Sequence, residues 1–238
     1  MPGSTRNGVI FAFLAYTMWG LFPLYFKLLK AVTPLEILSH RVIWSLAVMV
    51  VILLVKRHWA WLWALRTQPR VVGRYAASTG LLAINWLTYI WAVNHDHVLD
   101  GSLGYFINPL VVVMLAALVL GERLRPVQWV AVALAAAGVA WLTWQAGHPP
   151  WIALALAFSF GFYGLLRKTS PLGALEGLTL ETLLLFPLAL AYLGWLAAQQ
   201  QNVFLAASPG IQLLLVLAGP LTRWPGHVEF ASSCVGWA

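Results

Sequence analysis

The chain has 238 residues, of which 61% are hydrophobic and only 9% are charged, with a formal net charge of +7. A soluble domain carries about 25% charged residues, so this composition excludes a water-soluble globular protein. The lone cysteine, Cys234, excludes an internal disulfide framework, and the basic residues stand in short clusters between apolar runs, as in membrane loops rather than in a nucleic-acid-binding groove.

Seven apolar runs are each long enough to cross a bilayer core, which takes about 20 residues of helix. Because backbone groups in lipid must be hydrogen-bonded within their own segment, we expect all seven runs to be helices. In chain order they cover residues 8–26, 35–55, 75–94, 103–120, 127–144, 151–166 and 178–198. The predicted fold class is therefore an all-α, polytopic membrane helix bundle.

The links between these runs predict how the chain is oriented. If the N-terminus is cytoplasmic, the inside segments hold ten lysines and arginines, and the outside segments hold two, Lys27 and Lys30. Basic residues are enriched in cytoplasmic links, so we expect the N-terminus inside. The ten inside residues are Arg6, Lys56, Arg57, Arg66, Arg70, Arg74, Arg123, Arg125, Arg167 and Lys168.

The later runs resemble the earlier ones in sequence. A shift of 142 residues aligns the sixth run with the first, and a shift of 140 places residues 35–38 on residues 175–178. Five runs separate the copies, so the second would be inverted, as in secondary transporters with a substrate site near the midplane. The predicted domains are a first repeat at 1–146 and a partial second repeat at 147–222, although chance agreement is common in apolar sequence.

The end of the chain changes character. An apolar run starts at Ile211 and ends near Leu221, and about eleven residues are too few to span a membrane. Residues 223–238 form an aberrant polar tail. Two interpretations stay open, a soluble C-terminal tail or a span interrupted by a frameshift or a truncated gene model.

Two stretches in the third and fourth runs are distinctive. Residues 85–94 read Asn-Trp-Leu-Thr-Tyr-Ile-Trp-Ala-Val-Asn, and residues 102–110 read Ser-Leu-Gly-Tyr-Phe-Ile-Asn-Pro-Leu. They resemble the RarD-type proteins of the EamA branch of the drug/metabolite transporter superfamily, and four shorter motifs fit the same family. These are Trp19-Gly20, His40-Arg41, the Gly-Glu-Arg-Leu at 121–124 and Gln128-Trp129.

This resemblance implies ten helices in two inverted five-helix repeats and a secondary carrier of small molecules in the bacterial inner membrane. The family is linked by name to chloramphenicol and by kinship to the export of drugs and metabolites. A proton gradient is the expected driving force. The chain departs from the family pattern after about residue 222, so we expect a truncated or frame-shifted member with impaired transport.

Ionisable side chains inside a span are costly, and those that persist commonly mark a functional site. Glu36, His40 and Arg41 lie near the outer end of the second run, and the repeat places Glu181 opposite Arg41. We expect Arg41 to contact an anion or carboxylate, with His40 beside it and Glu181 as counter-charge or proton carrier. The alternative is that Arg41 and Glu181 snorkel to the interface.

A polar stripe in the third and fourth runs gives further candidates for substrate binding or coupling. Asn85 and Tyr89 share one helix face. Asn108 precedes Pro109, which removes a backbone hydrogen bond near Tyr105 and could break the helix beside a cavity. Bonding between helices and a plain proline kink remain the alternatives.

Flexible points occur at related positions of the two proposed copies. They are Trp19, Gly20 and Pro23 in the first run and Gly161 with Gly164 in the sixth. We expect these residues to act as gating points, and close packing of small residues is the alternative account.

No phosphate loop, nucleotide fingerprint, zinc motif or nucleophile elbow is present, so we expect no enzyme, no cofactor and no metal. His95 and His97 are interpreted as part of a solvated loop. Two rival functions are an intramembrane enzyme with Glu36 and His40 as acid and base, and a membrane partner that does not transport. The expected partners are the bilayer and an unidentified small molecule, with no nucleic acid. The small residues around Ala137 would let the fifth run pack closely on a neighbour, either within the protein or in a second copy that forms a homodimer.

Overall fold

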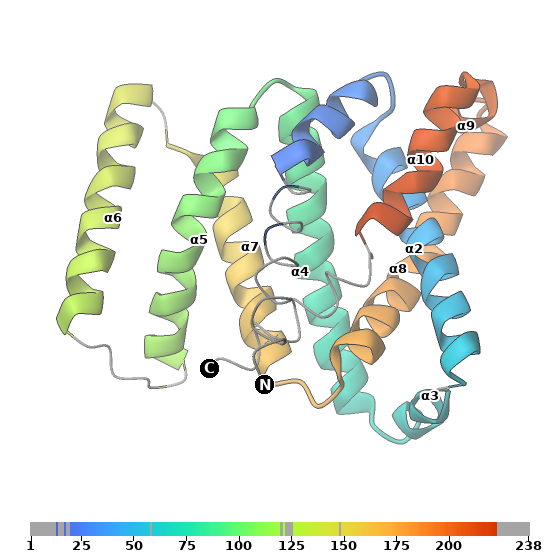
Figure 1. Cartoon of the computed structure of the whole chain (residues 1–238), viewed down its shortest axis with the longest axis horizontal. Helices are drawn as coiled ribbons and strands as arrows, with labels where there is room; N and C mark the ends of the chain where they lie inside the picture. The colour runs from blue at the N-terminus through green and yellow to red at the C-terminus, as the bar shows by residue number, and fades with distance from the viewer. Residues whose placement is uncertain are drawn as a thin grey trace. The chain divides into compact units, whose positions relative to one another are not determined.

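In the computed structural model the described residues are 13, 17, 20–57, 59–119, 121, 126–147 and 149–222. These residues form helices joined by short turns, with no strand among them (Figure 1). A helical stretch at residues 20–28 precedes the labelled helices. The labelled helices are α2 (Pro34–Lys56), α3 (Ala60–Leu65), α4 (Pro69–Asn94), α5 (Val98–Val119), α6 (Pro126–Ala146), α7 (Trp151–Lys168), α8 (Ala174–Ala198), α9 (Val203–Ala206) and α10 (Pro209–Thr222).

Five of the described helices are long and apolar enough to cross a membrane: α2, α4, α5, α6 and α8. They confirm the second, third, fourth, fifth and seventh predicted runs, and the chain is a multi-pass helical membrane protein. The sixth run forms α7, which ends on Arg167 and Lys168. Most of the first run, and all of residues 223–238, lie outside the described residues.

Several helices extend beyond the apolar runs. The helix α4 begins at Pro69, whereas the run was expected from residue 75, so Arg70 and Arg74 belong to the helix and not to the preceding link. Hydropathy marks only the part of a helix that faces lipid, while backbone hydrogen bonding continues into the headgroup region. Long basic side chains reach that region from the last turns of a span.

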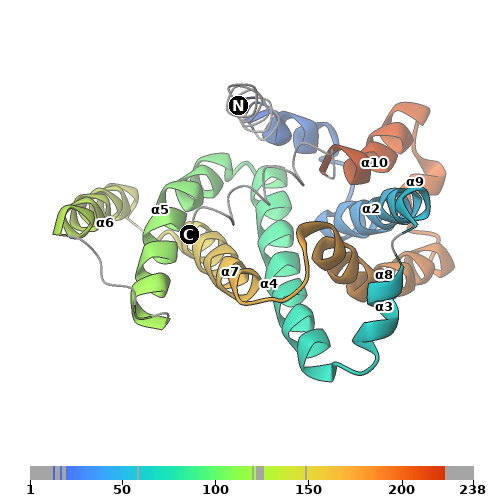
Figure 2. The same cartoon turned by 60° about the horizontal axis from the view of Figure 1, so that its bottom comes forward.

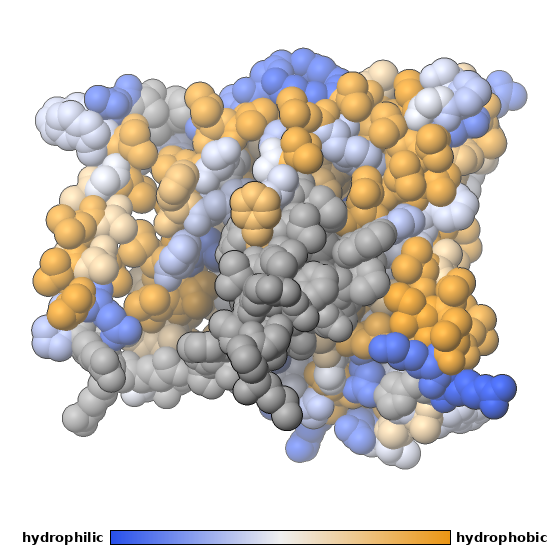
Figure 3. All heavy atoms as spheres, in the orientation of Figure 1, coloured by the Kyte–Doolittle hydropathy of each residue, from blue (hydrophilic) through white to orange (hydrophobic). Residues whose placement is uncertain are grey.

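The helix α6 shows how the lipid-facing surface is built. Large apolar side chains point outward along it, among them Val127, Leu134 and Trp141, which are 79%, 70% and 60% exposed. Apolar residues accordingly cover much of α6 in the space-filling view (Figure 3). Such a surface is unfavourable in water and is ordinary in lipid, which agrees with a spanning helix.

The chain folds into two compact units. Unit 1 comprises residues 1–76 and 171–238, and unit 2 comprises residues 77–170. In unit 1, α2 packs against both α8 and α10, and Figure 2 shows α2 between these two helices. In unit 2, α5 packs against α7 on one side and α6 on the other (Figure 1).

These units do not follow the predicted repeats. Unit 1 joins α2 from the first repeat to α8 and α10 from the second, and unit 2 joins α5 to α7 in the same way. The helices α2 and α8, which the internal alignment pairs as copies, therefore pack on each other. The inverted repeat and its boundaries at 1–146 and 147–222 stay a prediction.

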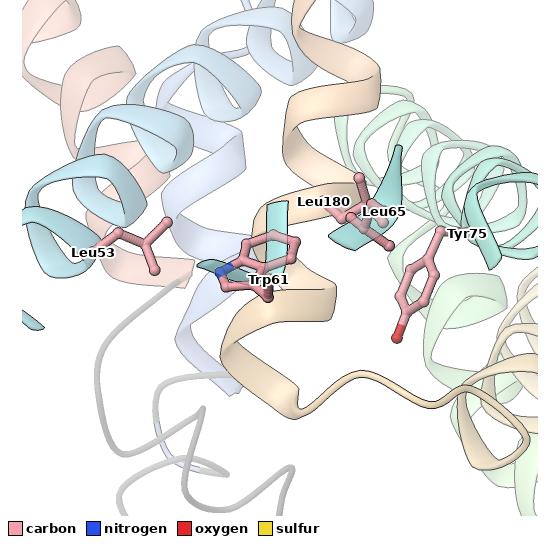
Figure 4. Close-up of a cluster of buried hydrophobic side chains, with 5 residues drawn as sticks. All are labelled: Leu53, Trp61, Leu65, Tyr75 and Leu180. Atoms are coloured by element: carbon pink, nitrogen blue, oxygen red, sulfur yellow. The ribbon is translucent and has the colours of Figure 1, made fainter. Parts of the chain in front are cut away.

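Unit 1 has a buried apolar cluster at the α3 end of α2. It consists of Leu53, Trp61, Leu65, Tyr75 and Leu180, contributed by α2, α3, α4 and α8 (Figure 4). Leu53 and Tyr75 have no exposed surface. The short helix α3 is thus fixed by its aromatic side chain, although six residues alone would not hold a helix in water.

Close backbone contact builds the core of unit 2. A Cβ added to Gly104 would lie 3.0 Å from the Leu156 Cβ, and one added to Gly161 would lie 2.8 Å from the Val111 Cγ1. Ala153 and Leu156 of α7 are buried against this face. Small residues allow helices to approach in lipid, where packing rather than water exclusion drives association.

Candidate functional site

Polar side chains gather at the start of α2 in unit 1. The helix begins after Thr33, whose hydroxyl accepts a hydrogen bond from the Glu36 amide at 3.4 Å, and Pro34 occupies its first turn. Glu36, His40 and Arg41 are 0%, 6% and 7% exposed. The helices α8 and α10 both pack on α2 in this unit.

Glu36 holds the link between α8 and α10. Its Oε1 accepts hydrogen bonds from the amides of Val203 at 2.9 Å and Phe204 at 3.3 Å, which open α9. The Phe204 ring lies over His40, with 4.7 Å between ring centroids. The side-chain amide of Gln212 donates a hydrogen bond to the Phe204 carbonyl at 2.9 Å. Contacts of Phe204 thus connect α2, α9 and α10.

Arg41 and Glu181 lie in the same unit, on the packed helices α2 and α8. Glu181 is 1% exposed and Arg41 is 7% exposed, so neither charged head extends to the surface. A snorkelling side chain would place its head at the surface, and the structure does not show that arrangement. The neighbouring hydroxyls of Thr179 and Thr182 donate within α8, to the carbonyls of Leu175 and Leu178, at 2.7 Å each.

The helical stretch before α2 closes this side of unit 1. The Tyr25 hydroxyl donates a hydrogen bond to the Leu214 carbonyl of α10. Pro23 lies within the same stretch, and a Cβ added to Gly20 would meet nothing within 4 Å. Gly20 is therefore not required for packing by the described contacts, and Trp19 lies outside the described residues.

The second candidate set lies in unit 2. The Asn85 amide donates to the Leu156 carbonyl and to the Ser159 hydroxyl, at 3.0 Å each. The Tyr89 ring packs edge-on against Tyr105, at 5.9 Å between centroids. Asn85 thus joins α4 to α7, which is the interhelical bonding considered as its alternative role.

Pro109 and the glycines of α7 do not break the helices. Pro109 lies inside α5, which is a single helix from Val98 to Val119, as a plain proline kink would also allow. The Asn108 Oδ1 is buried and has no partner among the described residues. Gly161 is a packing position, whereas a Cβ added to Gly164 would meet nothing within 4 Å.

The link after α4 is exposed at His95, Asp96 and His97, and its rings make defined contacts. The His95 and His97 rings stack with Trp91, at 4.4 and 5.7 Å between centroids. The His97 Nδ1 lies 3.0 Å from the Asp100 Oδ2. Within the described part of the chain, no group of three or more His, Cys, Asp or Glu side chains is arranged to hold a metal ion.

Sequence reasoning missed three side chains that the structure brings into these sites. Trp44 and Ser45 follow His40 by one helical turn and contact the α10 region, and Ser159 receives the Asn85 hydrogen bond. The spacing of Glu36, His40 and Trp44, four residues each, places them on one helix face and was the available signal.

The arrangement in unit 1 suits recognition of a polar solute. Charges of both signs and hydrogen-bonding groups lie inside a helix bundle. Away from water each polar interaction is strong, and a polar group without a partner raises the free energy of the folded state. Buried ionisable groups in membrane proteins generally face a pathway or a site.

Comparison with known proteins agrees with these features. Residues 6–144 match the EamA-like transporter family. Over 220 residues, which are 92% of this chain and 70% of the relative, the chain is 50% identical to Protein RarD of Streptomyces exfoliatus. No solved structure is significantly similar to it.

Two relatives from Pseudomonas aeruginosa extend the comparison. One is named as an uncharacterized transporter and is 50% identical over 220 residues, which are 92% of this chain and 74% of the relative. The other is named Chloramphenicol-sensitive protein RarD and is 33% identical over 231 residues, which are 95% of this chain and 77% of the relative.

Proposed function

The chain belongs to the EamA-like transporter family, and from that membership and the buried charges of unit 1 we propose that it carries small molecules across the bacterial inner membrane by secondary active transport. The observation that carries the proposal is the burial of Arg41 and Glu181 on two packed membrane helices. Two opposite charges held away from water are costly to maintain for stability alone.

The proposed mechanism is alternating access. The solute binds beside Arg41, which contacts an anionic or carbonyl group, and Glu181 balances the arginine or carries a proton. The site then opens to one side of the membrane and afterwards to the other. A proton gradient drives the cycle, because a membrane carboxyl group that gains and loses a proton couples solute movement to proton movement.

The name of one relative suggests a class of solute to test. One relative carries chloramphenicol sensitivity in its name, so phenicol drugs belong among the first compounds to test. The stretch matched to these relatives covers 70–77% of their lengths.

The test is flux of radiolabelled chloramphenicol in proteoliposomes with an imposed pH gradient. We expect Arg41→Ala and Glu181→Gln each to lower the initial rate at least about 10-fold, since each removes a charge that the buried site needs, at about 1.4 kcal/mol per tenfold change. The comparison includes the same substitutions at the equivalent positions of a full-length relative.

Two variants serve as matched controls. Arg66→Ala changes an arginine that lies 4.1 Å over the exposed Trp63 ring, and Glu176→Gln changes a carboxylate that accepts a hydrogen bond from the Gly173 amide at the start of α8. Both should retain most of the flux. Equal flux in the Arg41 and Glu181 variants and in wild type would refute the assigned roles, and absence of flux in every protein would favour a membrane partner that does not transport.

A further inference from the structure

Polar atoms of Glu36, His40, Trp44 and Ser45 on α2 are buried without a hydrogen-bond partner among the described residues. They are the Glu36 Oε2, the His40 Nε2, the Trp44 Nε1 and the Ser45 Oγ. Glu36 and Ser45 have no exposed surface, and His40 is 6% exposed. Buried polar atoms in native proteins are nearly always satisfied, so these four call for a hydrogen-bonding occupant beyond the described residues.

These atoms lie in one continuous stretch. Glu36, His40 and Trp44 recur every four residues and so share a helix face, and Ser45 adjoins them. With a rise of 1.5 Å per residue, the stripe from Glu36 to Trp44 covers about 12 Å of the helix. That length suits one small molecule.

The side chains of the stripe are positioned by their other contacts. The Glu36 Oε1 accepts the hydrogen bonds from the two α9 amides, whereas its Oε2 has no partner among the described residues. The His40 ring is held against Phe204. A nearby serine shows the usual solution in a helix, because the Ser39 hydroxyl donates to the Leu35 carbonyl at 2.8 Å. Ser45 lacks such a bond.

The segment α9–α10 covers the stripe. Phe204 lies over His40 at one end, and at the other end Gly219 of α10 approaches the backbone of Trp44 and Ser45 so closely that an added Cβ would collide with the Ser45 amide. A solute on this face would be enclosed by the same segment that Glu36 fastens.

We propose that Glu36, His40, Trp44 and Ser45 form a hydrogen-bonding site for a small solute with a donor group at one end and an acceptor group at the other. A carboxylate oxygen accepts and an indole N–H only donates, so the donor end of the solute faces Glu36 and the acceptor end faces Trp44. The inference rests on the proposed transport function, since it specifies the chemistry of the solute carried.

The test measures the melting temperature of the detergent-purified full chain with four compounds. L-phenylalanine and chloramphenicol each carry donors and acceptors, phenethylamine has a donor end only, and 3-phenylpropionate has an acceptor end only. We expect at least one of the first two to raise the melting temperature more than either single-ended compound. A compound that binds only the folded state stabilises it, and at equal concentration the tighter binder gives the larger stabilisation.

Trp44→Phe and Ser45→Ala test the site itself. Each should weaken binding of the stabilising compound about 3–10-fold in Kd, the effect of losing one hydrogen bond. Ser45→Ala should not lower the melting temperature without solute, because it removes a polar atom that has no partner among the described residues. Ser39→Ala is the matched control, and it should bind like wild type.

Two results would overturn the inference. One is that each of the four compounds shifts the melting temperature of wild type and of the Trp44→Phe, Ser45→Ala double variant by the same amount. The other is a lower melting temperature of Ser45→Ala without solute together with unchanged binding, which would indicate an internal water or structural role. If flux depends on Arg41 and Glu181 while these variants bind normally, the transport function stands and this site fails. If binding depends on Glu36, His40, Trp44 and Ser45 while no flux occurs, this site stands and the transport function fails.

Discussion

Buried polar residues in this protein fall into two kinds. Thr179, Thr182 and Ser39 each satisfy their hydroxyl with a carbonyl of their own helix. Glu36 instead bonds to a segment more than 160 residues later in the chain. The first kind needs only a helix to be tolerated in lipid, whereas the second depends on tertiary structure and is where function is to be sought.

At the scale of single residues, Gly219 gives a direct test of packing in unit 1. Replacement by alanine should destabilise the protein by about 1–3 kcal/mol, because the added methyl group collides with the backbone of α2 at Ser45. Gly210→Ala in the same helix is the control, since a Cβ there meets nothing within 4 Å. Thermal unfolding in detergent measures both. Equal melting temperatures for the two variants would mean that α10 does not pack on α2 at this point.

At the scale of whole helices, the exposure of α6 differs from that of α2. None of the residues in the apolar window of α6 is buried, whereas more than half of those in α2 are. A helix that is apolar around its circumference and carries a run of alanines faces lipid or another helix. We propose that α6 also packs on a second copy of the chain.

Cysteine crosslinking tests this contact. In a Cys234→Ser background, Ala137→Cys on α6 should give a disulfide-linked dimer in membranes treated with oxidant, because small residues bring paired helices close enough for a disulfide. Ala189→Cys on α8 serves as the control, since Ala189 is 7% exposed within unit 1. A monomer in both variants after complete oxidation would argue against a dimer through α6.

At the scale of the whole molecule, orientation in the membrane is the main untested expectation. A cysteine at Lys168, at the end of α7, should react with an impermeant maleimide only after the cells are opened, and a cysteine at Lys30 should react in intact cells. The reason is the excess of basic residues in the links assigned to the cytoplasm. Labelling of both positions from the same side would contradict the predicted topology and with it the inverted repeat.

Much of the fold was predictable from hydropathy. Five predicted runs are helices of spanning length and composition, because about 20 apolar residues in lipid have no other way to bond their backbone. The start of α4 at Pro69 was not predictable in this way, since Arg70 and Arg74 are polar and yet helical. Hydropathy reports the surroundings of a residue and not its backbone conformation.

The candidate site was predicted in part. Arg41, His40 and Glu181 stood out because ionisable residues are rare in a span, and the structure buries all three in unit 1. The bonds from Val203 and Phe204 to Glu36 had no signal in the sequence. Backbone amides are present at every residue except proline, so only their placement reveals a bond.

The sequence by itself determined that this protein lies in a lipid bilayer, that it is helical and to which family it belongs. Composition and local motifs carry that information without any long-range contact. Only the tertiary structure decided that α2 packs against both α8 and α10. It also decided which polar atoms of α2 are hydrogen-bonded to other described residues and which are not. Whether a buried atom is satisfied depends on segments far apart in the chain, and their meeting is set by packing of the whole unit.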